Sequence, residues 1–467
     1  MFKQYINISK IKITKLCSGL NSKGFLNVIG SIIIFMVFGS LYTWSNINVF
    51  FVSYLKQYNS PNIEIVDGYF LMPIINFISN CSNYFGTKIE EKLGYKICLF
   101  LSLLMTCGSH FFLIFTTRLP IIYILMIIFG ISIGIGYITT TRNTWYFYPE
   151  KKGFISGIIL FGFGVSSMIF SAIADKIINP NNENSEPNGF FNKSISDNTF
   201  LYIKRLNIIL FIMSLIGFLL ISDYNKINPK NSEDKDKGND NSSLKIKEVF
   251  KSRQIWIIIA LNFCSLYFLY MVTNTYRSFG QLNLLNSVLL SYLSSFYSLI
   301  NGFGRIIWGF LLDKYDFKNL YYSILFSEMI ISLSIFYAGK YQILYFIMIC
   351  TCSFLYSGLI VTSVIIFPKI YGIKYSNKIF SIACIICGSS CLLGPIASKL
   401  IIKNTNDYKK VYLSGLIFSL IAVICLYYLN DNEFIYTSEQ INKNLIDSKE
   451  NQNNQVKEIE FRDFSNA

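Results

Sequence analysis

The sequence predicts an all-α membrane protein whose twelve transmembrane helices form two six-helix bundles. Only 15% of the 467 residues are charged, whereas 52% are hydrophobic and the mean hydropathy is +0.44. A soluble domain normally carries about a quarter charged residues, so this chain has too little polar surface to fold in water. Long apolar stretches account for the difference, because a helix of about 20 mostly apolar residues crosses the hydrocarbon core of a bilayer.

Twelve such stretches occur along the chain, six on each side of a polar interruption. The first six lie near residues 27–53, 68–86, 97–117, 120–141, 154–175 and 203–222. The second six lie near residues 254–276, 286–311, 319–338, 341–366, 376–402 and 411–429. This division predicts an N-terminal bundle over residues 27–222 and a C-terminal bundle over residues 254–430.

Three polar segments flank and separate the bundles: an N-terminal arm (1–26), a linker (223–253) and a tail (431–467). The linker contains the run NPKNSEDKDKGNDNSS, which cannot bury enough apolar surface to fold and is predicted to be disordered. Most of the 41 Lys and Arg residues fall in these segments or in loops on the same side of the membrane. The positive-inside rule therefore predicts that the arm, the linker and the tail are cytoplasmic.

The composition also narrows the classes of function. Because loop placement explains most of the formal charge of +14, nucleic acid is not an expected partner. The eleven cysteines show no regular spacing and His110 is the only histidine, so we expect no metal, no cofactor and no enzymatic activity. Residues 1–24 are polar and basic and lack the apolar run of a signal peptide, so we expect a cytoplasmic arm there. We expect a monomeric multi-pass protein of the plasma membrane or of an organelle membrane, with plastid and mitochondrial membranes among the options.

The loops after the second and eighth stretches repeat one pattern at equivalent places in the two halves. They read GTKIEEKLGYK (86–96) and GFLLDKYDFK (309–318). Each has a glycine at the end of a helix and then an acid–base pair: Gly86, Glu91 and Lys92 in the first loop, and Gly309, Asp313 and Lys314 in the second. Internal repetition on this scale is typical of transporters built from two bundles.

This pattern resembles the glycine–acid–base loop signature of the major facilitator superfamily, which occurs once per half. The resemblance implies the major facilitator fold and transport by alternating access. It also implies that the six loop residues named above act as a conformational latch. The chain departs from the signature at Gly86, which sits one residue early, and at Asp316, where the family usually has glycine.

Three further stretches carry a narrower resemblance, to the oxalate/formate antiporter and monocarboxylate transporter group. FGSLYTWSNINVFF (38–51) resembles the first helix of that group, and YFYPEKKGFISGIILFGFG (146–164) resembles its connection between the fourth and fifth helices. NGFGRIIWGF (301–310) is similar to its eighth helix, which carries an intramembrane arginine. The similarity covers residues from about 25 to 430 and implies a small organic anion as substrate.

Arg305 is the main candidate for binding that anion. A charged side chain inside an apolar stretch is costly and usually faces a cavity on a substrate path, and a guanidinium matches the geometry of a carboxylate. The alternative is an arginine near the helix end that pairs with Asp313 or extends toward the cytoplasm. Five other residues are candidates for lining a substrate site: Tyr42, Trp44, Tyr270, Asn274 and Asn301.

Departures from the group narrow the predicted substrate and coupling. The antiporter branch has a second cation on its eleventh helix, whereas Lys399 lies at the far end of that helix here, so a monocarboxylate is favoured over oxalate. The proton-coupled branch has an acid four residues before the arginine, where this chain has Asn301. Glu328 in the ninth stretch is a candidate proton carrier, but a structural bridge to a neighbouring helix is the favoured role.

The sequence thus predicts a secondary active or facilitative transporter of a small monocarboxylate of the pyruvate, lactate or formate type. One alternative is a neutral amino-acid carrier of the same fold, whose substrate would also present a carboxylate to Arg305. Its ammonium group would need an acid in the cavity. The other alternative is a non-transporting membrane sensor that uses the linker and the tail as signalling arms.

Overall fold

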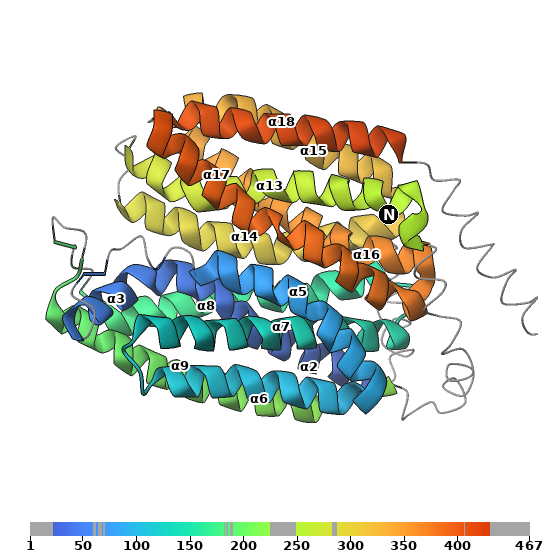
Figure 1. Cartoon of the computed structure of the whole chain (residues 1–467), viewed down its shortest axis with the longest axis horizontal. Coiled ribbons are helices and arrows are strands. Elements are labelled where there is room, and N and C mark those ends of the chain that lie inside the picture. The colour runs from blue at the N-terminus through green and yellow to red at the C-terminus, as the bar shows by residue number, and fades with distance from the viewer. Residues whose placement is uncertain are drawn as a thin grey trace, which may run out of the picture.

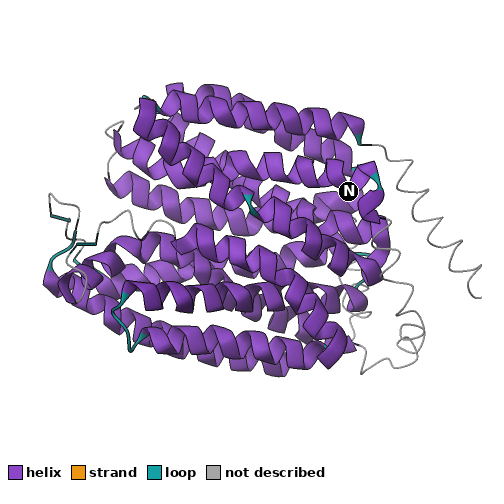
Figure 2. Ribbon diagram, in the orientation of Figure 1, coloured by secondary structure: helices purple, strands orange, loops and turns teal. Residues whose placement is uncertain are grey.

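A computed structural model describes residues 22–58, 62–63, 68, 71–181, 183, 185–186, 190–224, 249–282, 287–405 and 407–429. Most of the predicted N-terminal arm and linker, and the whole predicted tail, lie outside the described residues. Within the described part, Figure 2 shows helices joined by loops, and no residue is assigned to a strand. The predicted all-α membrane fold is confirmed.

The helices form two bundles that lie side by side, the N-terminal half below and the C-terminal half above in Figure 1. The first bundle consists of α2 (Ser22–Gly39), η1 (Ser40–Tyr42), α3 (Thr43–Tyr58), α5 (Leu71–Leu93), α6 (Tyr95–Leu113), α7 (Leu119–Phe147), α8 (Lys152–Ile178) and α9 (Lys193–Leu220). The second consists of α13 (Arg253–Leu282), α14 (Ser287–Lys314), α15 (Phe317–Ala338), α16 (Gln342–Gly388), α17 (Ser390–Thr405) and α18 (Tyr408–Tyr428).

Ten segments of the described residues are long and apolar enough to cross a membrane. Two further helices, α5 with 23 residues and α14 with 28, are long enough but fall outside this set. Both carry a row of polar side chains that lowers their hydropathy. With α5 and α14, the fold is consistent with the twelve predicted membrane helices.

Several membrane segments are divided differently from the prediction. The predicted break between the tenth and eleventh stretches is absent from the described helices, because α16 continues to Gly388 and α17 follows from Ser390. The first membrane segment is a composite of α2, η1 and α3, because a 3₁₀ segment at Ser40–Tyr42 interrupts the α-helix. The sixth begins at Lys193 instead of near residue 203. Its earlier start follows from Asn192, whose side chain accepts a hydrogen bond from the backbone N–H of Ile195 at 3.1 Å and so caps the helix.

The most extensive packing between the bundles is that of α8 on α14 and of α5 on α16. The α8–α14 contact is close because glycines face backbone atoms of the other helix. A Cβ added at Gly157 would meet the carbonyl oxygen of Arg305, and one added at Gly309 would meet that of Gly153. Small residues at such crossings let membrane helices approach closely.

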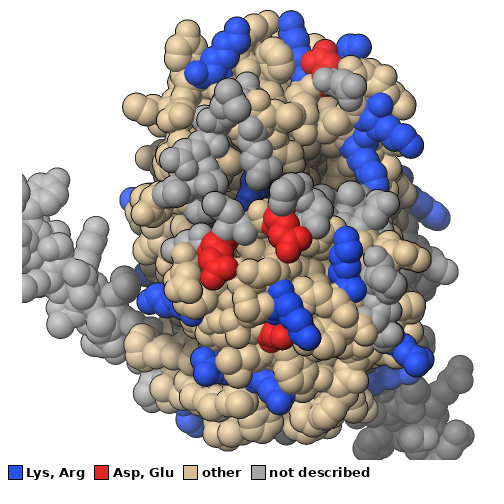
Figure 3. Space-filling view, turned by 90° about the vertical axis from the view of Figure 1, so that its left-hand side faces the viewer, with Lys and Arg blue, Asp and Glu red and all other residues tan. Residues whose placement is uncertain are grey.

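The outward faces of the bundles are apolar. On α9, for example, an exposed row consists of Ile208, Phe211, Leu215 and Leu219. Charged side chains instead collect at the two ends of the helices. Figure 3 views one end, where Lys, Arg, Asp and Glu are scattered among uncharged residues. This distribution fits a protein whose middle lies in lipid.

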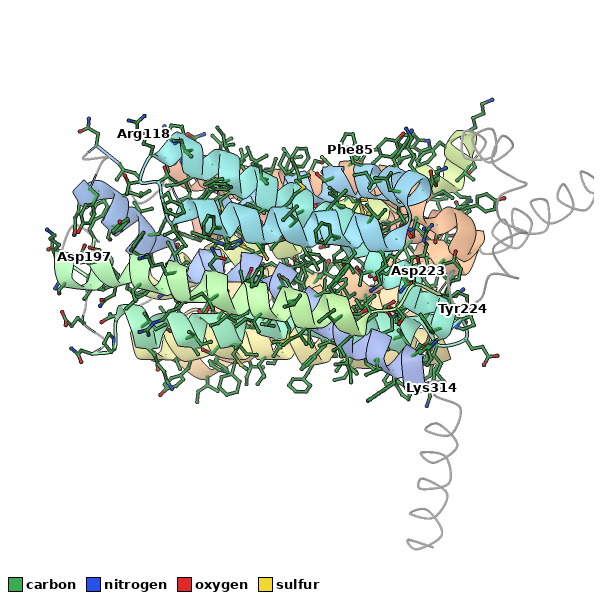
Figure 4. All side chains as sticks on the ribbon, turned by 90° about the horizontal axis from the view of Figure 1, so that it is seen from below. Phe85, Arg118, Asp197, Asp223, Tyr224 and Lys314 are labelled. Carbon is green, nitrogen blue, oxygen red and sulfur yellow. The ribbon has the colours of Figure 1, made fainter. Side chains whose placement is uncertain are left out.

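The loops segregate between these two ends. Figure 4 shows Arg118 and Asp197 at one end of the molecule, and Asp223 and Lys314 at the other. We call the end that carries Lys314 the latch end, because the loops after α5 and α14 lie there. The charge bias of the sequence predicts that the latch end faces the cytoplasm.

Candidate functional site

A cavity of about 100 Å³ lies between the two bundles, where α5 and α8 meet α14 and α16. Its first-bundle wall includes Tyr42, Asn76, Ser79, Asn80, Asn83, Tyr137 and Phe163. Its second-bundle wall includes Asn262, Tyr270, Arg305, Ser363, Cys384 and Cys387. Arg305 is the one charged residue among the described lining residues, so the cavity is cationic at a single point.

Arg305 is only 1% exposed and is held by neutral acceptors. The side-chain oxygen of Asn301 accepts hydrogen bonds from Nε at 3.1 Å and from Nη2 at 2.8 Å. The backbone oxygen of Leu160, on α8, accepts one from Nη1 at 3.0 Å. A guanidinium has five N–H donors, so two remain for a ligand in the cavity. This geometry agrees with a cavity-facing arginine and not with pairing to Asp313.

Aromatic side chains surround the guanidinium. Its central carbon lies 5.6 Å from the centre of the Phe163 ring, within range of a cation–π contact. The Tyr42 ring packs edge-on against Phe163 with centres 5.2 Å apart, and its hydroxyl lies 3.1 Å from that of Tyr356 in the other bundle. Tyr270 packs against Tyr356 with ring centres 5.7 Å apart. The cavity thus combines a cation with an aromatic, hydroxyl-bearing rim.

The structure separates the predicted substrate-binding residues into three groups. Tyr42, Tyr270 and Arg305 line the cavity together. Asn301 lies behind Arg305, where it orients the guanidinium.

The remaining two candidates lie away from the lining. Trp44 is buried inside the first bundle, with ring centres 5.3 Å from Phe51 and 6.5 Å from His110. Asn274 is exposed and donates to the backbone oxygen of Tyr270. Periodicity alone placed both residues on the correct helices but did not reveal which way they face.

Sequence reasoning missed the amide-bearing face of α5. Asn76, Ser79, Asn80 and Asn83 recur at three- and four-residue intervals, which places them on one side of the helix. The same face continues to Thr87, whose hydroxyl lies 2.8 Å from that of Ser381 on α16. The available signal was a polar helical stripe inside an otherwise apolar stretch, since such residues face the interior of a bundle.

At the latch end, the loop after α5 contacts the second bundle through charged and amide groups. Glu91 forms an ion pair with Lys378 of α16 at 2.8 Å. Its neighbour Glu90, buried on α5, forms an ion pair with Arg142 of α7. With its amide in the favourable orientation, Asn377 of α16 accepts from Arg142 at 2.9 Å. Arg142 therefore links the two bundles through Glu90 and Asn377.

The loop after α14 uses a different chemistry. The two carboxylate oxygens of Asp313 accept hydrogen bonds from the backbone N–H groups of Gly153 at 2.9 Å and Phe154 at 2.7 Å. Both groups belong to the first turn of α8, where free N–H groups and the helix dipole favour an anion. Asp313 thus caps a helix of the other bundle.

The other four loop residues have local roles. A Cβ at Gly86 would meet the backbone of Ile135 at 2.7 Å, so this glycine lets α5 approach α7 within the first bundle. Gly309 plays the corresponding part between α14 and α8. Lys92 is exposed at the end of α5, and the Lys314 ammonium lies 4.2 Å from the centre of the Phe310 ring.

Glu328 is fully buried between α15 and α18, outside the cavity lining. The Ser419 hydroxyl, on α18, donates to its Oε2 at 3.2 Å. Its Oε1 has no hydrogen-bond partner among the described residues. This position corresponds to the helix bridge that the sequence favoured over proton transfer.

The two-bundle arrangement agrees with comparisons to known proteins. A family model for the Major Facilitator Superfamily matches residues 199–395. The Escherichia coli fucose:proton symporter FucP superposes with a TM-score of 0.64 at 11% identity, covering 88% of this chain and 100% of that one. The proton:xylose symporter XylE, bound to 6-bromo-6-deoxy-D-glucose, superposes with a TM-score of 0.59 at 13% identity, covering 88% of this chain and 95% of that one.

The match over residues 199–395 and the structural likeness show that the chain has the major facilitator fold, as the loop signature implied. Likeness at this level of identity establishes the fold and leaves the substrate open.

The chain is also similar in sequence to three curated relatives. It is 24% identical to the uncharacterized MFS-type transporter YhjX of Escherichia coli over 62% of this chain and 66% of that protein. It is 23% identical to apicoplast pyruvate carrier 1 of Toxoplasma gondii over 34% of this chain and 35% of that protein. It is 23% identical to the oxalate:formate antiporter of Oxalobacter formigenes over 77% of this chain and 80% of that protein. The chain thus spans less than two thirds of the first two relatives.

Proposed function

We propose that this chain carries a small monocarboxylate across a membrane, with Arg305 binding the carboxylate. The observation that supports the proposal is the position of Arg305. It is buried at the cavity wall, and the acceptors it has from the protein are an amide oxygen and a backbone carbonyl. A buried cation with neutral partners attracts an anion, and a carboxylate can accept both remaining N–H donors at once.

Counting charges favours a monoanion. Arg305 is the one cation among the described lining residues, while Lys399 is exposed on α17 outside the lining. A dianion would leave its second carboxylate buried without a cationic partner, which is costly in a low-dielectric site. A monocarboxylate of the pyruvate, lactate or formate type is therefore favoured over oxalate.

Two of the relatives also support this substrate class. Their names describe an oxalate:formate antiporter and a pyruvate carrier, and oxalate, formate and pyruvate are all small organic anions. The apicoplast location of the second supports the plastid among the membranes considered for this chain.

The neutral amino-acid alternative lacks comparable support. A substrate ammonium would need an acid near Arg305, and the described lining contains no Asp or Glu. Glu328 lies outside the lining, between α15 and α18, where its carboxylate accepts a hydrogen bond from Ser419.

Transport by alternating access would follow from rocking of one bundle against the other. At the latch end, Asp313 of α14 accepts a hydrogen bond from the first turn of α8, and Glu91 of α5 forms an ion pair with Lys378 of α16. Release of both contacts would open the cavity toward that end.

Uptake of labelled acids into proteoliposomes tests the proposal. Arg305→Gln removes the carboxylate partner, and breaking a buried charge pair costs about 3–5 kcal/mol, so affinity should fall at least about a hundredfold. Arg305→Lys should rescue in part, because an ammonium cannot form the bidentate contact. Arg253→Gln, which removes an exposed cation at the start of α13, is the matched control. Near-normal affinity in Arg305→Gln would refute the assignment.

A further inference from the structure

The amide-bearing face of α5 supplies a second, uncharged wall of the cavity that holds Arg305. Asn76, Ser79, Asn80 and Asn83 all line that cavity. An amide in a membrane helix is costly to desolvate unless it faces the bundle interior and finds a partner. The three amides on this helical face therefore favour a ligand in the cavity that can form hydrogen bonds with them.

Asn83 is the most informative of the four. Its side chain is 3% exposed, and its Oδ1 has no hydrogen-bond partner among the described residues. Its Nδ2 makes only a long contact, 3.4 Å, to the backbone oxygen of Asn80. Buried amides in folded proteins are nearly always hydrogen-bonded, so the end of this side chain is available for a ligand.

The backbone at Asn83 is held by hydroxyl groups of both bundles, which fixes where its side chain begins at the cavity wall. Its carbonyl oxygen accepts from the Thr87 hydroxyl at 2.8 Å and from the Ser381 hydroxyl of the other bundle at 3.2 Å. A preorganised polar group of this kind discriminates strongly between ligands that can and cannot hydrogen-bond to it.

We propose that Asn83, on the amide face of α5, is a specificity-determining residue that binds a second, uncharged oxygen of the substrate. This inference rests on the proposed function, in which Arg305 holds the carboxylate. A carboxamide offers both an acceptor and two donors, so it accommodates an oxo or a hydroxyl oxygen. Because the face carries no charge, it recognises an oxo- or hydroxy-monocarboxylate and provides nothing for a second carboxylate.

Pyruvate and propionate provide a matched test, because they differ chiefly in the oxo oxygen. In proteoliposomes of the full chain, the wild type should transport pyruvate with a KM about tenfold lower than that for propionate, equivalent to about 1.4 kcal/mol. Asn83→Ala should raise the KM for pyruvate and leave the KM for propionate unchanged, so that the ratio of the two KM values approaches one. Asn83→Ser, which keeps a hydrogen-bonding group, should restore part of the ratio.

Asn207→Ala is the matched control, because Asn207 is also a buried asparagine with an unpartnered amide atom but lies on α9 outside the lining. It should keep the wild-type ratio. Propionate uptake by Asn83→Ala shows that the variant is folded and inserted, and its complete loss would overturn the assignment of a specificity role.

The two proposals fail in different ways. The role of Asn83 is overturned if Asn83→Ala keeps the wild-type ratio of KM values for pyruvate and propionate, or if the wild type has equal KM values for the two acids. In either case, uptake that depends on Arg305 still upholds the proposed function. Uptake that does not depend on Arg305, or uptake of neither acid, overturns the proposed function and the role of Asn83 with it.

Discussion

Asn301 and Arg305 lie one turn apart on α14, and one amide oxygen of Asn301 accepts hydrogen bonds from two nitrogens of the guanidinium. The contact fixes the plane of the guanidinium without neutralising it. An aspartate in the same place would form a fork with the arginine and cancel its charge. The neutral partner therefore leaves Arg305 fully charged toward the cavity.

Replacing Asn301 by Asp should make anion transport depend on pH. At pH 7.5 the new carboxylate would pair with Arg305 and raise the KM for pyruvate, by about tenfold if the pairing costs about 1.4 kcal/mol. Below the pKa of the introduced carboxyl, protonation removes the competing charge, so affinity should recover as the pH falls. Initial rates in pH-clamped proteoliposomes measure this effect.

The wild type should not show that recovery. The titratable groups that share the cavity with Arg305 are tyrosine hydroxyls and thiols: Tyr42, Tyr137, Tyr270, Cys384 and Cys387. Such groups are ordinarily uncharged below about pH 8. Asn301→Ala separates the lost hydrogen bonds from the added charge, and a recovery at low pH in that variant would count against the explanation.

Removing the helix cap formed by Asp313 should slow turnover more than it weakens binding. Asp313→Asn loses the charge and one of the two acceptors for Gly153 and Phe154. Loss of a cap costs about 1 kcal/mol, enough to change the balance between conformers about fivefold. Measuring kcat and KM for the same substrate in the wild type and the variant tests this, and kcat should change more than KM.

Asp316→Asn is the control for that experiment, since Asp316 is three residues away and its side chain makes no capping hydrogen bond. A raised KM with unchanged kcat in Asp313→Asn would show that Asp313 acts in binding and not in closing the latch end.

Glu328 should contribute to helix packing and not to proton coupling. Glu328→Gln keeps a group that can accept from Ser419 and should retain wild-type uptake at every pH. Ser419→Ala removes the donor and should lower stability modestly, because hydrogen bonds between membrane helices average about 0.6 kcal/mol. Thermal unfolding of the purified variants measures the second effect. A pH optimum that moves in Glu328→Gln would restore Glu328 as a proton carrier.

The predicted orientation can be tested at the linker. A protease site inserted between residues 231 and 243 should be cut only by protease added to the cytoplasmic side, because the charge bias of the loops favours that side. A second site in the loop after α6, near Arg118 at the opposite end of the molecule, should be cut only from the other side. The reverse pattern would invert the topology.

The sequence by itself determined the membrane class and the two-bundle fold, and it predicted that Arg305 faces a cavity. Each follows from the cost of placing polar groups in lipid: apolar stretches of sufficient length must be helices, and a cation inside one of them must face a cavity. The two repeated loops could be recognised because their spacing is local to each half. The amides of α5 carried the same kind of signal, as a polar helical stripe.

The tertiary structure decided which residues meet. Gly153 lies far from Asp313 in the chain, and only the packing of α8 on α14 brings a free helix end to that carboxylate. Trp44 and Tyr42 are neighbours, yet the 3₁₀ segment and the packing of the first bundle direct one toward His110 and the other toward the cavity. Local pattern predicts that a helix has a polar face, but the partner of that face is set by the helices packed against it, because burial is a property of the assembled bundle.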